Sequence, residues 1–505
     1  MADLYSLPRE LRNHIYKFYF EVEGGYAYNF STGKLTSASG QPIELALRSV
    51  SRFFREETCG LALELNTLHF SSEYNHSLQR RAGHFNSLLM RLEQLKARYL
   101  VWRVSRAGLF DDTIYSHVEA RHPQYTSLIR KLEQGRVYDI PLSKYWKDTP
   151  SKTCQFVTSI LAAVAAHPKF FKLTENSPRW TPEKSGYDDP REVIVYNYMP
   201  WKIPTEEDIM AMKHVLGSEN RVDDTNRNDI RYRYRFRYQF SAASVALSFL
   251  DSMSRFAQLQ IRKIVIHEEN RAVAWPQCHA QGFIPFCQRN PKLRIERRVD
   301  LWKAILLAAS GLLIDNENPR GYPWSENAHD CAQADSITSG IQDEQGCIAS
   351  CIMEVMALHS LGMPPQSFRM VIDGDLTPTQ STRIFDVAKR NAAWQIAFEA
   401  CLSDRRIWQA PLDWWEIRPN SAYIMDGFPE ALRAMTNGQS PVSCNFDIGQ
   451  MPDTESLVSQ GRTWTLEEWE SNWTASVPAN IDTEVPSCSW LDLQRENTLP
   501  PTTPP

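Results

Sequence analysis

The sequence predicts a helix-rich α+β protein, and three observations lead to that class. Apolar residues recur at helical spacing near the N-terminus and along several later segments. In the second half of the 505-residue chain, helices alternate with short apolar segments of strand length, which is typical of βα units beside a mixed or parallel sheet. After residue 437 the composition turns to Ser, Thr, Pro and acidic residues, which predicts a disordered tail.

Residues 1–75 are predicted to form a helical module that has little apolar area of its own. Ser6 can cap a first helix, and Pro8 is tolerated in its first turn. Residues 31–41, rich in Gly and Ser, are expected to be a flexible loop, and a second helix and a short strand at 67–70 follow. Spacings of four, four and three place one apolar stripe on the first helix. That stripe consists of Leu7, Leu11, Ile15 and Phe18.

The rest of the chain divides into a helix-rich and loop-rich region at 76–228, an α/β body at 229–437 and a tail at 438–505. In the body, Ser241 is expected to cap a helix, and two helix-then-strand segments, 241–267 and 347–373, suggest leucine-rich-repeat-like units. The expected strands are 231–240, 259–267, 293–299 and 368–372, and the expected helices after that cap are 279–290, 301–313, 347–361 and 379–402.

The tail is expected to be mostly disordered, with one exception. Residues 463–473 can form an acidic helix, since Leu466, Trp469 and Trp473 fall on one face.

Composition narrows the classes of partner. Hydrophobic residues make up 42% and charged residues 23% of the chain, as in folded soluble proteins. Residues 446–505 hold ten acidic and two basic residues, and the remainder holds 50 acidic and 53 basic residues. A nearly neutral body does not favour nucleic acid as the partner. The longest apolar run, 304–314, is too short to span a bilayer, so no membrane partner is expected.

The ten cysteines are scattered and no secretory signal is visible, which predicts reduced thiols in the cytoplasm or nucleus.

Residues 6–16 and 47–57 resemble the degenerate F-box-like module that opens many uncharacterised proteins of filamentous fungi, and residues 238–302 resemble the body of the same proteins. The resemblance implies protein–protein recognition, with docking to a Skp-type adaptor of a cullin-RING ubiquitin ligase. It implies no catalytic residues and no cofactor. The residues it assigns to the partner contact are Leu7, Pro8, Leu11 and Ile15. The alternative is that these four side chains only pack the module onto the body.

Two other functions stay open. Alternating Arg and aromatic residues over 231–237 offer an Arg row to a nucleic acid, although alternation puts the rings on the opposite face. Asp373 and Asp375 follow a strand end, where enzyme sites often lie. Cys347 and Cys351 share a helical face, but core packing explains them better than a metal. The sequence therefore favours a non-catalytic interaction protein, with no metal, cofactor or small-molecule ligand.

Overall fold

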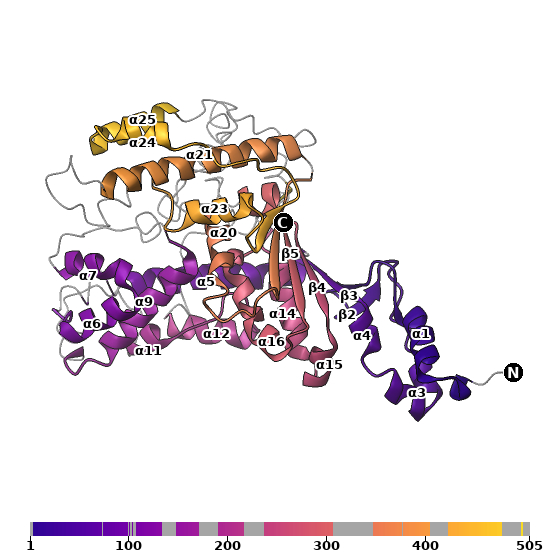
Figure 1. The fold of residues 1–505 in the computed structure, drawn as a ribbon. Helices are drawn as coiled ribbons and strands as arrows, with labels where there is room; N and C mark the ends of the chain where they lie inside the picture. Colours follow the sequence, from indigo (N-terminus) through magenta and orange to yellow (C-terminus); the bar gives the residue numbers. More distant parts are fainter. Residues whose placement is uncertain are drawn as a thin grey trace, which may run out of the picture.

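Seven β-strands form one mixed sheet in the computed structural model of this protein (Figure 1), in the spatial order β2-β1-β3-β4-β5-β6-β7. The strands are β1 (Tyr26–Asn29), β2 (Lys34–Ser37), β3 (Thr67–Ser71), β4 (Lys263–Glu268), β5 (Arg294–Asp300), β6 (Phe368–Asp373) and β7 (Val442–Cys444). The structure describes residues 4–72, 74–98, 100, 104, 108–133, 148–170, 190–216, 237–306, 347–375, 377–403, 423–476 and 496–497.

From β3 to β7 every strand pairs in parallel with the next strand of the chain, and only β1 and β2 pair antiparallel. Parallel strands that advance in one direction with right-handed connections place their connecting helices on one face of the sheet. Helices and strands thus alternate around a mixed sheet, which confirms the predicted α+β class and its βα units.

The helices that lead into or connect the strands of the body are α14 (Ala242–Ser252), α15 (Arg255–Gln260), η4 (Pro276–Phe283), α16 (Ile284–Arg289), η5 (Leu301–Leu306), α20 (Cys347–Ala357), α21 (Pro378–Ser403) and α23 (Phe428–Thr436). Ser241 caps α14 as predicted, because its side chain accepts a hydrogen bond from Ser244 N. Further helices pack beside this layer: α5 (His76–Arg98), α6 (Asp112–Arg121), η3 (Pro123–Tyr125), α7 (Thr126–Glu133), α9 (Pro150–Ala165), α11 (Pro190–Val195) and α12 (Glu206–Val215).

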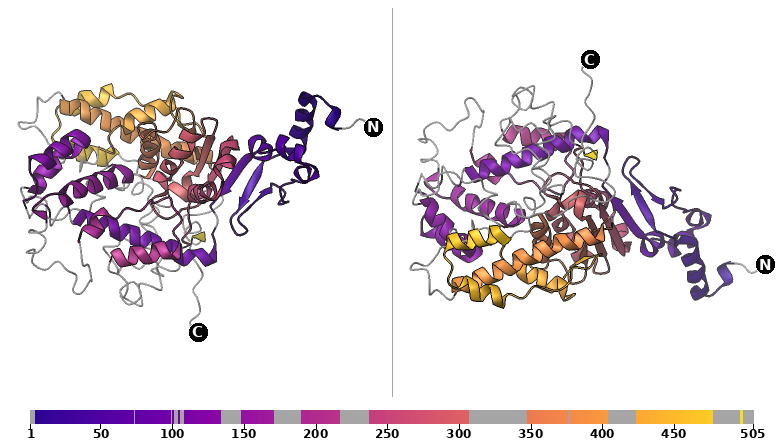
Figure 2. Two further views of the ribbon diagram at one scale, coloured as in Figure 1. Left: turned by 90° about the horizontal axis from the view of Figure 1, so that it is seen from below. Right: turned by 90° about the horizontal axis from the view of Figure 1, so that it is seen from above.

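The N-terminal module shares the core of the body. It contains η1 (Leu4–Ser6), α1 (Arg9–Phe20), the hairpin β1–β2, α2 (Leu47–Val50), α3 (Arg52–Glu57), α4 (Leu61–Leu65) and β3. Tyr16 and Phe20 of α1 belong to the same buried cluster as Ile264 of β4 and Val442 of β7. Figures 1 and 2 nevertheless show the helices of the module projecting from one side of the body. The module is thus fixed to the body and accessible from outside.

Several sequence predictions are wrong over the described residues. Ser6 lies in η1 and does not cap α1, whose N-cap is Pro8. The expected loop at 31–41 contains β2, which pairs with β1. The expected disorder of the tail is wrong for residues 438–476, which contain β7, α24 (Glu455–Gly461) and α25 (Leu466–Ser476), and the rest of the tail, apart from 496–497, lies outside the described residues. The acidic helix foreseen inside the tail is α25, and its Trp469 and Trp473 are buried against Trp394 of α21. The expected strand at 231–240 lies outside the described residues up to position 236, and residues 237–240 are not a strand.

A buried polar cluster joins α14 to the sheet. Glu268 forms a 3.0 Å ion pair with Arg297, and both side chains are almost fully buried. The same carboxylate accepts hydrogen bonds from Ala242 N and Ala243 N at the start of α14. A carboxylate stabilises a helix N-terminus, so Glu268 both pairs with Arg297 of β5 and stabilises the start of α14.

The ring of His279 is buried beside this cluster. We expect its burial to make the folded protein less stable in acid. Its Nε2 lies 2.6 Å from Ala274 O and its Nδ1 lies 2.6 Å from Ser241 Oγ. Burial lowers the pKa of His279 to about 3, whereas a histidine in the unfolded chain has a pKa near ~6.5. Below the pKa of the unfolded chain, the unfolded state binds a proton at this histidine and the folded state does not. The free energy of unfolding therefore falls by about 2 kcal/mol from pH 7 to pH 5. Urea unfolding at both pH values checks this, and a His279→Gln variant with an undiminished pH slope would contradict it.

Candidate functional site

The first helix, α1, presents two apolar faces. Tyr16 and Phe20 are buried, and Asn66 holds the end of the helix by donating from Nδ2 to Phe20 O at 2.7 Å. The opposite face carries Leu11, Ile15 and Phe18, which are 51%, 40% and 84% exposed. Each residue advances by roughly 100° around the helix axis. Each of positions 11, 15 and 18 is therefore separated by about 100° or more from positions 16 and 20. From Leu11 to Phe18, the stripe predicted from the sequence is therefore the outward face of α1, whereas Leu7 precedes the helix and is half-buried.

The residues assigned to partner contact occupy this outward side. Pro8, Leu11 and Ile15 are exposed, and Leu7 is half-buried. Further apolar side chains of the module are exposed on α2, on α3 and just before α2, and we call the whole set the module face. It consists of Leu11, Ile15, Phe18, Tyr19, Leu45, Val50 and Phe53. A group of large exposed apolar side chains on a fixed scaffold is typical of an interaction surface.

Glu57 of α3 holds α1 in place. Its carboxylate accepts hydrogen bonds from Arg12 Nε at 2.9 Å, Arg12 Nη2 at 2.7 Å and Tyr16 OH at 2.6 Å, and it also binds Arg9. The hydrogen bonds from Arg12 lower the pKa of Glu57 to about 2, although burial opposes this. The link therefore persists at neutral pH and is lost only as the pH falls from about 4.5 toward that value.

Replacing Glu57 by Gln is expected to loosen α1. The variant cannot pair with the two guanidinium groups, so α1 should open locally more often. Amide hydrogen exchange over residues 9–20 should accelerate by roughly tenfold or more, a change of about 1.4 kcal/mol. Glu56→Gln is the matched control, because among the described residues Glu56 forms an ion pair with Arg52 alone, in an exposed i,i+4 contact. Equal exchange rates in the two variants would contradict this role of Glu57.

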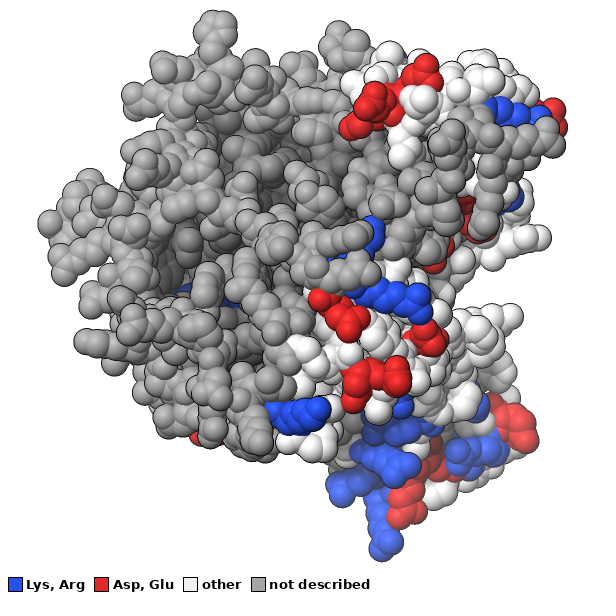
Figure 3. Space-filling view, turned by 90° about the vertical axis from the view of Figure 1, so that its left-hand side faces the viewer, with Lys and Arg blue, Asp and Glu red and all other residues white. Residues whose placement is uncertain are grey.

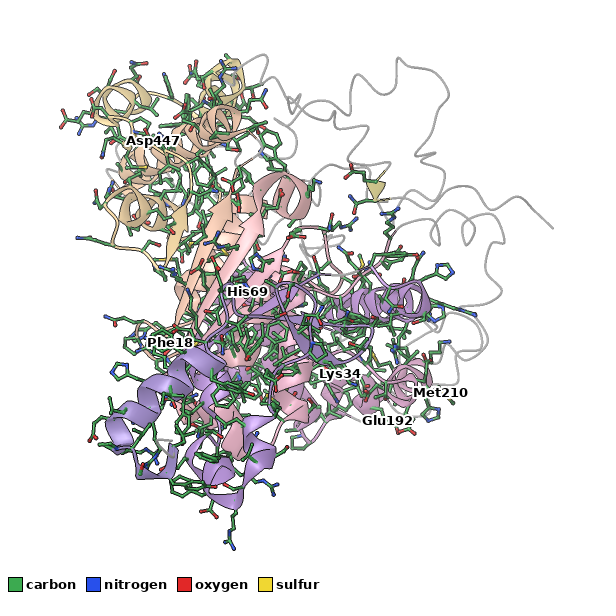
Figure 4. The ribbon with its side chains drawn as sticks, turned by 90° about the vertical axis from the view of Figure 1, so that its right-hand side faces the viewer. Phe18, Lys34, His69, Glu192, Met210 and Asp447 are labelled. Atoms are coloured by element: carbon green, nitrogen blue, oxygen red, sulfur yellow. The ribbon has the colours of Figure 1, made fainter. Side chains whose placement is uncertain are left out.

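A second candidate site lies on the face of the sheet opposite the packed helices. A cavity of about 690 Å³ opens there, between the turn that follows α1 and the strands β3, β4 and β5. His69 and His267 both line it, with His69 Nδ1 and His267 Nε2 3.1 Å apart and the two rings stacked. Figure 4 looks onto this side of the molecule, with His69 and Phe18 labelled. The sequence did not reveal the pair, since β3 and β4 are far apart in the chain.

The turn at Glu21–Gly25 that borders this cavity needs glycine. Gly25 has φ of +68°, and a Cβ there would lie 2.3 Å from Thr67 O of β3. Only glycine allows the module to approach the sheet so closely.

Asp373 ends β6 and Asp375 follows two residues later, and both line a smaller cavity of about 130 Å³. Asn445 donates to Asp373 Oδ1 at 2.8 Å, as does Asp375 N at 3.0 Å. Nearby, burial raises the pKa of Asp300 to about 6. Among the residues that the structure describes, no three His, Cys, Asp or Glu side chains are placed to hold a metal. Asp373 thus has a structural role in closing the turn after β6.

The predicted Arg row lies outside the described residues except for Arg237. The guanidinium of Arg237 lies 5.4 Å from the centre of the Tyr74 ring, and its backbone N donates to Asn497 O. Burial raises the pKa of Cys351 on α20 to about 12, so this thiol stays protonated and packs as an apolar group.

Comparisons with protein-family models, with curated proteins and with solved structures find no match to this chain. Among the helices of the described ranges, none is both long and apolar enough to cross a membrane. The site must therefore be interpreted from its own geometry.

Proposed function

We propose that this protein is a non-catalytic recognition protein that docks a Skp-type adaptor through the module face, as the F-box-like resemblance implies. The observation that carries the proposal is the orientation of α1. Leu11 and Ile15 point outward, while Tyr16 and Phe20 anchor the same helix in the core. If the stripe only packed the module onto the body, these two side chains would be buried.

The attachment of the module supports the same function. The module face is carried by a helix that Glu57 and Asn66 hold at both ends. A rigid apolar surface loses little conformational entropy when it binds, which favours affinity. Because the module and the body share one core, a partner on α1 would be held at a fixed position relative to the sheet.

Neither alternative function has comparable support in the described residues. Figure 3 shows Lys and Arg intermixed with Asp and Glu on the described part of one side, rather than one basic field. Asn445 donates to the carboxylates of Asp373 and Asp375, and the backbone N–H of Asp375 donates to Asp373 Oδ1.

The test is binding of a purified fungal Skp-type adaptor to the intact protein. Retention of the adaptor on immobilised protein is the expected result. Absence of retention, with a folded chain verified by circular dichroism, would refute adaptor docking.

A further inference from the structure

The sheet face opposite the helices, which we call the open face, is polar and half-exposed. Side chains alternate along a strand, so the neighbours of the buried Leu68, Ile264 and Met370 point away from the core. The residues of the open face are Thr67, His69, Ser71, Lys263, Val265, His267, Arg294, Glu296, Arg298, Asp300, Arg369, Val371 and Asp373. Four are Lys or Arg and three are acids, but Asp300 and Asp373 stand at the carboxyl ends of β5 and β6, so the rest of this face is basic although the chain as a whole is acidic.

Glu296 orients two arginines side by side on the open face. Its side chain is only 4% exposed, and Oε1 accepts from Arg298 Nε at 2.7 Å. The other oxygen, Oε2, accepts from Arg369 Nε at 3.1 Å and also from Arg369 Nη2. These hydrogen bonds outweigh the effect of burial and keep the pKa of Glu296 below its usual value. One buried carboxylate thus fixes two guanidinium groups on adjacent strands.

The two guanidinium groups still have N–H groups that can donate hydrogen bonds to a ligand. Their side chains are 49% and 63% exposed. Within the described residues, Arg298 Nη1 and Nη2 and Arg369 Nη1 donate no hydrogen bond. An arginine held through one edge can still bind a carboxylate or phosphate through the other.

The cavity extends this basic site along β4. Lys263 lines it, is exposed and has no ion-pair partner among the described residues. Burial lowers the pKa of His69 and of His267, and the positive charge of Arg298 lowers both further, so the rings are neutral near pH 7. Apart from Glu296, the acidic residues that line the two described cavities of this face stand at its ends. Glu21 and Glu23 lie on the turn after α1, and Glu269, Asp300 and Asp373 lie at the carboxyl ends of β4, β5 and β6.

We propose that the open face binds an acidic segment of a protein partner, with its carboxylate or phosphate groups on Arg298, Arg369 and Lys263. Charge complementarity selects this occupant, because Arg298 and Arg369 share one carboxylate and Lys263 has no ion-pair partner among the described residues, so these cations exceed the anions beside them. The acidic groups at both ends repel an acidic chain and confine it to the middle of the face. This binding does not depend on adaptor docking at the module face.

The test uses the full chain and three fluorescein-labelled peptides in fluorescence anisotropy. One peptide alternates Glu and Ser, the second carries phosphoserine at each Ser, and the third carries Gln at each Glu. The acidic peptides should bind and the Gln peptide should not, with affinity that falls as salt is added. Tighter binding of the phosphorylated peptide would identify phosphate as the preferred anion, and equal binding would identify carboxylate.

Two variants locate the site. Lys263→Gln removes an exposed, unpaired charge and should weaken binding of the acidic peptides roughly tenfold. The triple variant Glu296→Gln, Arg298→Gln, Arg369→Gln removes both arginines without leaving a buried charge, and it should weaken binding further. Lys34→Gln on β2 is the matched control, since Lys34 is an exposed strand lysine outside the cavity. Equal binding by the Lys263→Gln and Lys34→Gln variants, or no binding of either acidic peptide at low salt, would overturn the proposal.

The Leu11→Asp, Ile15→Asp variant separates the two surfaces. It should bind the acidic peptides with the same affinity as the unmodified protein, although it no longer binds the adaptor. Loss of peptide binding in this variant would contradict independent sites.

Discussion

Replacing Glu268 by Ala is expected to lower the free energy of unfolding by about 3–5 kcal/mol. The substitution leaves the charge of Arg297 buried without its partner, since that side chain is only 3% exposed. It also removes the acceptor for Ala242 N and Ala243 N, and both of these groups are buried at the start of α14. A buried charge without its partner and buried N–H groups without an acceptor both destabilise the folded state. The single substitution therefore has two destabilising effects.

Urea unfolding followed by tryptophan fluorescence measures this loss. Glu269→Ala is the matched control, because Glu269 is the exposed neighbour of Glu268 and should change stability by less than about 0.5 kcal/mol. A Glu268→Gln, Arg297→Met variant removes both charges together and should recover part of the loss. If Glu268→Ala were as stable as Glu269→Ala, the buried pair would not hold α14 to the sheet.

The second large effect concerns binding. Leu11→Asp together with Ile15→Asp is expected to weaken adaptor binding at least about a hundredfold, since buried apolar anchors contribute about 2 kcal/mol or more each at interfaces. The stability of the chain should change little, because both side chains are exposed in the unbound protein. Isothermal titration calorimetry with the purified adaptor measures the affinity.

A matched pair of exposed apolar residues provides the control. Met210 on α12 and Phe256 on α15 are 69% and 53% exposed and lie outside the module face. Met210→Asp with Phe256→Asp adds the same charge and should leave the affinity unchanged. Equal weakening by both double variants would mean that the adaptor does not recognise the module face.

Features of the structure that depend on neighbouring residues in the sequence could be predicted from sequence patterns. The period of the stripe from Leu7 to Phe18 predicted α1, and Ser241 marked the start of α14. The pattern could not decide which face of α1 is outward, because Tyr16 and Phe20 form a second apolar pair on the same helix. Only the position of β3 and of the body settles that choice.

The errors arose where contacts between distant residues decide the structure. Residues 34–37 become β2 because they pair with β1, which in turn pairs with β3. The tail is polar overall, yet Trp464, Trp469 and Trp473 pack against Trp394 and order it over α21. A few large aromatic side chains thus outweighed the average composition of the segment.

The open face could not be found from sequence for a related reason. His69 and His267 meet because β3 and β4 are neighbours with a register that places His69 beside Val265. Glu296 and Arg369 meet through the pairing of β5 with β6. Alternation within each strand marked the side chains that share a face, but only the strand order brings them together.

Hydrogen exchange of the full chain with and without the adaptor tests the central claim most directly. The account predicts protection of residues 9–20 and 47–57, with unchanged exchange in β4, β5 and β6. Tight adaptor binding with protection elsewhere and none in α1 would contradict it.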